Sequence, residues 1–176
     1  MSATTIEDQL ADVRRRIDRL ARTQAGGPTE SARIQRHLDA LQQEEASVLA
    51  AADGAPDEVD EKLGRLRTRL AVAEHSLVAD VSDDWASFAA AVEEELRSWD
   101  TYLERLQTSV AAKAWKARER AEAAIGEVRS RRIAVDGRLA QARDGAGDGS
   151  EDARKRVTAA RDELGRKADE LSAKLK

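Results

Sequence analysis

The chain has 176 residues, of which 36% are charged and 41% hydrophobic, and its formal net charge is −4. This balanced, slightly acidic composition argues against a general affinity for nucleic acid or for anionic lipid. The sequence contains no cysteine, which excludes disulfides and thiolate metal sites, and no apolar run suits a signal peptide or a membrane span, so we expect a cytoplasmic protein.

Much of the apolar content is alanine, and large apolar side chains recur at helical spacing. Such a chain has enough large side chains to line narrow helix seams, but not enough to fill a broad core. We therefore predict an all-α protein, shaped as an elongated antiparallel helical bundle or coiled coil that contains one long rod-like helix.

Glycine and proline divide the first part of the chain into three helical segments. The breakers lie at 25–28 and 53–56. Before the first of them, Ile6, Leu10, Val13, Ile17 and Leu20 alternate spacings of four and three, which places them on one helix face. We expect helices at about 4–24, 29–52 and 57–80, and because their lengths are similar and the loops short, residues 1–80 are predicted to form an antiparallel three-helix bundle.

The remaining part, 81–176, is predicted to hold a long helix and a returning helix. Ser82, Asp83 and Asp84 resemble a helix start, which favours a break or bend near Val81, although a continuous helix through this point stays open. From Trp85 the apolar seam continues to Ala142, which predicts one helix at about 82–143, roughly 90 Å long at 1.5 Å per residue. After the glycine-rich segment 144–149, a helix at about 150–175 can cover only the distal part of this rod. The first bundle or another copy would have to cover the rest.

All five aromatic residues lie between positions 85 and 115. Trp85, Phe88 and Trp99 fall on the seam, where aromatic residues usually form core. Tyr102 and Trp115 flank the seam, so we consider these two the better candidates for a contact surface.

The predicted rod is also an electrical dipole. Residues 81–112 hold seven acidic and two basic residues, and residues 113–143 hold nine basic and four acidic residues. One hypothesis is that two copies pair antiparallel about Ala112, each acidic half facing a basic half, and the alternative is a solvated face with accidental asymmetry. The residues proposed for a partner interface are Trp85, Phe88, Trp99, Tyr102, Trp115, Glu94, Lys116, Arg120 and Arg131.

Two other functions remain open. The basic stripe at 113–132, together with Trp115, could bind nucleic acid, because basic groups pair with phosphates and an indole stacks on bases. An amphipathic helix could instead coat a membrane or granule surface, although the apolar stripe is narrow and rich in alanine.

No residue constellation indicates a reaction, a cofactor or a metal. His37 and His75 lack the spacing of metal ligands and are interpreted as lone surface histidines. The loop at 144–149 lacks both the preceding strand of a phosphate loop and the ligand pattern of a calcium loop. We expect a non-enzymatic structural or interaction protein that acts through coiled-coil helix surfaces, on a protein partner or as a homo-oligomer.

The segment from Asp84-Trp85-Ala86-Ser87-Phe88 to Trp99-Asp100-Thr101-Tyr102-Leu103, with the charged helix and Gly-Asp loop that follow, resembles small bacterial coiled-coil proteins of the stress-response type. The resemblance covers about residues 82–176. It implies a bacterial source and a non-enzymatic helical hairpin, and it implies no ligand and no residue roles.

Overall fold

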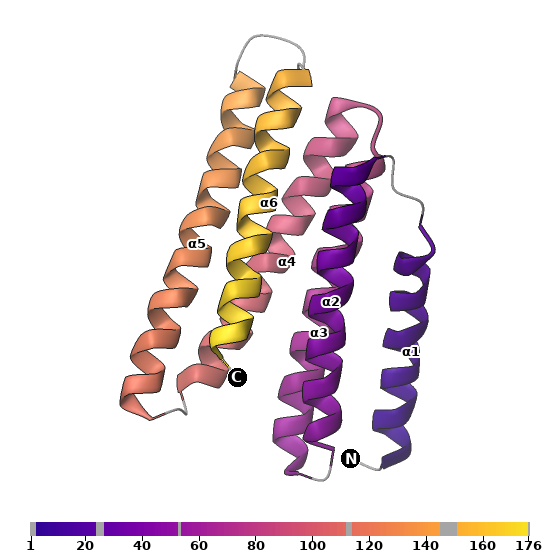
Figure 1. Cartoon of the computed structure of the whole chain (residues 1–176), viewed down its shortest axis with the longest axis vertical. Coiled ribbons are helices and arrows are strands. Elements are labelled where there is room, and N and C mark those ends of the chain that lie inside the picture. The colour runs from indigo at the N-terminus through magenta and orange to yellow at the C-terminus, as the bar shows by residue number, and fades with distance from the viewer. Residues whose placement is uncertain (1–2, 24–26, 53, 112–113, 145–150, 176) are drawn as a thin grey trace.

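The computed structural model describes residues 3–23, 27–52, 54–111, 114–144 and 151–175, and in these ranges the chain forms six helices and no strand. The predicted all-α class is confirmed. The helices pack against one another, with their long axes broadly aligned (Figure 1). They are α1 (Ala3–Ala21), α2 (Pro28–Ala50), α3 (Pro56–Val81), α4 (Trp85–Ala111), α5 (Trp115–Asp144) and α6 (Glu151–Lys174).

Proline defines the starts of α2 and α3. Pro28 and Pro56 each occupy the first turn, where the missing N–H costs no helical hydrogen bond, and the residue before each is extended. The helices expected at about 4–24, 29–52, 57–80 and 150–175 are present as α1, α2, α3 and α6, with ends that differ by a few residues.

The helix breaks after Val81, as the sequence favours. Ser82 has an extended backbone, and the Ser87 backbone N–H donates to the Asp84 carboxylate at 2.8 Å. This hydrogen bond satisfies one of the free N–H groups in the first turn of α4, which is how an N-cap residue stabilises a helix start. A continuous helix from α3 into α4 is thereby excluded.

The prediction of one long helix at 82–143 is wrong. Helix α4 ends at Ala111, α5 begins at Trp115, and the two helices pack against each other (Figure 1). The prediction failed because the sequence between α4 and α5 contains no glycine or proline and the apolar spacing continues through it, so nothing in the pattern indicates a break. Folding back buries apolar side chains of both helices, which outweighs the few helical hydrogen bonds given up at the turn.

Two clusters of buried apolar side chains fill the interior. The first is formed mainly by α1, α2 and α3, and the second by α4, α5 and α6 with Val72 and Ala79 of α3. Helices α3 and α4 pack closely against each other. A division into domains at residue 80 stays a prediction. No helix within the described ranges combines the length and apolar character needed to cross a membrane.

Candidate interaction surface

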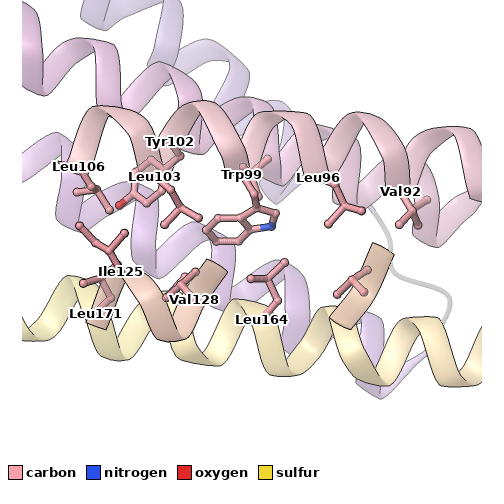
Figure 2. Packing of buried hydrophobic residues seen from close by; sticks show 14 of the residues in the cluster. Val92, Leu96, Trp99, Tyr102, Leu103, Leu106, Ile125, Val128, Leu164 and Leu171 are labelled. Carbon is pink, nitrogen blue, oxygen red and sulfur yellow. The ribbon is translucent and has the colours of Figure 1, made fainter. Parts of the chain in front are cut away.

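Three of the five aromatic residues are core residues. Phe88, Trp99 and Tyr102 are each 1% exposed, and all three belong to the second cluster. Figure 2 shows Trp99 between Leu96 and Leu103, pointing toward the side chains of the neighbouring helices. Trp85 is partly buried, with its ring centroid 5.6 Å from that of Phe88. Phe88, Trp99 and Tyr102 are thus buried in the packing between helices, whereas Trp85 keeps part of its surface exposed.

Tyr102 corrects one expectation, because it was assigned to a contact surface and is buried. Its hydroxyl donates to the Glu44 carboxylate of α2 at 2.7 Å, and burial together with the charge of Glu44 raises the pKa of the phenol. The assignment assumed that one helix covers the apolar seam of α4, in which case residues beside the seam would face solvent. Here side chains from α2, α3 and α6 surround this part of α4.

Trp115 is the aromatic residue that stays at the surface. It begins α5 and is 69% exposed, and the Arg118 guanidinium lies 5.0 Å from the centroid of its ring. A large apolar side chain exposed to this degree loses the favourable free energy that burial would supply. Trp115 is therefore the first residue of a candidate interaction surface.

Ile133 is the second residue of this surface, and it is 65% exposed. It follows Trp115 by about five turns of α5, so the two side chains lie on the same helix face. This face is opposite the buried stripe of α5, which consists of Ala121, Ala124, Ile125, Val128, Val135 and Leu139.

Small residues, together with the exposed Glu119, separate the two large ones on this face. A Cβ atom added at Gly126 or Gly137 would meet nothing within 4 Å, which shows that the space above both glycines is open. Ala123 and Ser130 on the same face are also exposed. We call this surface the outer face of α5 and define it by Trp115, Ala123, Gly126, Ser130, Ile133, Gly137 and Ala140.

Ion pairs within the chain involve several of the charged residues that make 81–112 acidic and 113–143 basic. Arg132 contacts Asp100 of α4 at 2.7 Å, and Arg143 pairs with Glu93, whose pKa is lowered by that hydrogen bond. On the side toward α6, Arg131 contacts Glu163 at 3.0 Å and Lys167 lies 3.8 Å from Glu127. Acidic residues of α4 and basic residues of α5 thus meet within one molecule, along the length of the two packed helices.

The remaining candidate residues stay at the surface. Lys116 and Arg120 are exposed near the start of α5, and Glu94 pairs with Arg97 on the same helix. Lys113 and Ala112 lie outside the described residues. Because Arg131 and Arg132 are committed to carboxylates of the same chain, the basic stripe is more fragmented than the sequence suggested.

A buried ion-pair network connects the two clusters, and sequence reasoning missed it. The guanidinium of Arg161, with 1% of its side chain exposed, donates to Glu95 at 2.7 Å, to Asp80 at 3.0 Å and to the Ser76 carbonyl at 3.0 Å. Arg33 of α2 also binds Asp80, and it donates to Asp162 of α6 at 2.8 Å. Four helices are joined in this way. The available signal was that Arg161 stands at a seam position, four residues after Val157 and three before Leu164.

Both histidines differ from the expectation of lone surface residues. His37 is 7% exposed, and its pKa is lowered well below the usual range because burial disfavours the charged form and Arg69 and Arg161 add repulsion. His75 is partly buried, and its Nδ1 lies 3.0 Å from the Ser98 hydroxyl. Among the described residues no cluster of His, Asp and Glu could hold a metal ion.

A cavity of about 470 Å³ opens between α2, α3, α4 and α6. Its ionisable side chains contact one another: Tyr102 donates to Glu44, and Lys62 pairs with Glu58 at 2.7 Å. Arg65 lies 3.6 Å from Glu44. At that distance the buried Arg65 Nε makes an ion pair with Glu44 but no hydrogen bond. Comparison of the chain with protein-family models, with curated proteins and with solved structures finds no match.

Proposed function

We propose that this chain is a non-enzymatic interaction protein, built as an antiparallel bundle of coiled-coil helices, and that the outer face of α5 binds a helix of another polypeptide. One observation carries the proposal. Trp115 and Ile133, two large apolar side chains that are each about two thirds exposed, lie on a single helix face, with the open Gly126 between them and the open Gly137 beyond Ile133. Exposed apolar surface of this kind marks interaction sites.

The small residues favour a helix as the bound element. Helix axes approach to 8–10 Å, and the side chains at the contact set the distance, so glycine, alanine and serine permit a close approach. Trp115 and Ile133 then serve as anchors at either end, which is how large side chains concentrate binding free energy in an interface.

Coating of a membrane or granule is less well supported by the same face. Binding to a lipid surface grows with the apolar area that enters it, and Gly126, Ser130 and Gly137 contribute little. Nucleic-acid binding is also less well supported, because Arg131 and Arg132 pair with carboxylates of their own chain.

Position-specific photo-crosslinking in the source cells tests the proposal. A photoreactive residue at Ser130 probes the outer face of α5, and one at Thr101, an exposed position on α4, is the matched control. We expect covalent protein adducts from Ser130 and few from Thr101. Equal yields at the two positions, or none at Ser130, would contradict the proposal.

A further inference from the structure

We infer that the helix bound by the outer face of α5 is α5 of a second copy, running antiparallel about a two-fold axis at Gly126. This inference rests on the proposed function and names its partner. The arrangement of residues on either side of Gly126 supports it, first through size and then through charge.

Large and small side chains are placed symmetrically about Gly126. Trp115 lies eleven residues before Gly126 and Gly137 lies eleven after it, so an antiparallel copy sets each indole over a glycine of the other chain. The open space above Gly137 accepts the ring. Ile133, seven residues after Gly126, then meets the exposed Glu119 of the other chain, seven residues before Gly126, one turn from Ala123. At the axis itself the two Gly126 residues allow the closest approach of the backbones.

Charges on the flank of α5 that faces α4 alternate in the order this pairing requires. Arg118 lies eight residues before Gly126 and Asp136 lies ten after, so they come together between copies. Glu122 lies four before and Arg129 three after, which brings a second pair of opposite sign together. Symmetry doubles both pairs, and such flanking charges select partner and orientation in helix pairs.

Charges on the opposite flank are already neutralised within each chain. Arg131 binds Glu163 and Glu127 lies near Lys167 of α6. On the flank that faces α4, Arg118 also lies 3.6 Å from Glu122 and Asp136 lies 3.2 Å from Arg132 within one chain, so the two-fold pairing adds contacts between copies to these ion pairs and leaves those on the other flank intact. A single helix face is a small interface, so we expect a weak, concentration-dependent dimer.

Disulfide trapping tests the orientation, because the native chain has no cysteine. In purified Gly126→Cys the two thiols meet at the axis, whereas in Ala140→Cys, also on the outer face, they lie far apart in an antiparallel pair. Under mild oxidation we expect a covalent dimer from Gly126→Cys and little from Ala140→Cys. Equal trapping at both positions indicates parallel pairing, and no trapping at Gly126 indicates no such pair; either result overturns the inference.

Sedimentation equilibrium over a range of concentrations tests the contacts. Gly137→Glu should weaken dimerisation at least tenfold, and Gly137→Ala, which keeps the position small, should retain it. Asp136→Arg should also weaken it, and adding Arg118→Glu in the same chain should restore it. A native chain that stays monomeric, or a charge reversal without rescue, overturns the inference. If the adducts at Ser130 contain a different protein, the proposed function stands and this inference fails.

Discussion

At the scale of single residues, the arginines show where sequence patterns stop being informative. Arg161 and Arg69 occupy seam positions, yet their surroundings in sequence resemble those of exposed arginines. The structure buries both, with Arg69 2.9 Å from Asp169 and 4.5 Å from the centroid of the Trp99 ring. A buried guanidinium needs carboxylates to compensate its lost hydration, and those carboxylates come from other helices.

Replacing Arg161 by leucine should therefore be strongly destabilising. The change leaves Glu95 buried without its cation and removes one of the two cations that bind Asp80. Breaking a buried pair in this way costs about 3–5 kcal/mol of unfolding free energy. Urea unfolding measures it, with Arg166→Leu as the control on the same helix, because a surface ion pair contributes about 0–1 kcal/mol. Similar losses in the two variants would show that the network does not stabilise the fold.

His37 predicts how stability depends on pH. Its pKa is lower in the folded chain than in the unfolded chain, so below about pH 6.5 the unfolded chain binds the extra proton. Its contribution is complete above this pH and falls as the pH decreases, by at most about 1.4 kcal/mol per pH unit.

Unfolding free energies measured between pH 7.5 and 5.5 check this sign. The native chain should lose stability over the interval, and His37→Gln should lose less. The other titratable groups, including the arginines that act on His37, are the same in both proteins, so the difference isolates the imidazole. A steeper loss in the variant would contradict the prediction.

At the scale of elements, α5 has two faces with different tasks. Its buried stripe was predicted from the seam, which runs through Ile125, Val128, Val135 and Leu139. The sequence proposed Trp115 for a contact surface, but the rest of the outer face was not predicted, because its small residues carry no periodic hydrophobic signal. Its character becomes evident once the structure shows which side of α5 stays open.

Two substitutions should separate these tasks. Leu139 is 1% exposed, and Leu139→Ala should lower the unfolding free energy by about 2–5 kcal/mol through lost burial and a residual cavity. Ile133→Ala should change it by no more than about 0.5 kcal/mol, because the side chain is mostly exposed, while weakening self-association. Chemical unfolding and sedimentation equilibrium measure the two effects. A large loss of stability in Ile133→Ala would mean that the outer face belongs to the fold.

At the scale of the whole molecule, the first and second halves of the chain are connected more closely than two separate units would be. Helix α3 packs against α4 and contributes Val72 and Ala79 to the second cluster, and the Arg33 and Arg161 network crosses between the halves. Contacts of this kind couple the unfolding of both parts.

We therefore expect one cooperative unfolding transition. All three tryptophans lie in α4 and α5, so their fluorescence reports on the second half, whereas far-ultraviolet circular dichroism reports on every helix. The two signals should give coincident urea transitions, with midpoints within about 0.2 M, which is less than the shift that 1 kcal/mol produces at typical urea slopes of about 1–3 kcal/mol per M. Separate midpoints would instead support independent domains divided near residue 80.

The sequence by itself determined the helical class, the starts of α2, α3 and α4 to within about three residues, and the stripes that become core, because these depend on backbone chemistry and on periodicity within one segment. Tertiary structure alone decided the division of the seam into α4 and α5, the burial of Tyr102 and His37, and the ion pairs around Arg161. Each of these depends on which distant helix lies opposite, and the free energy gained there exceeds what local helix propensity contributes.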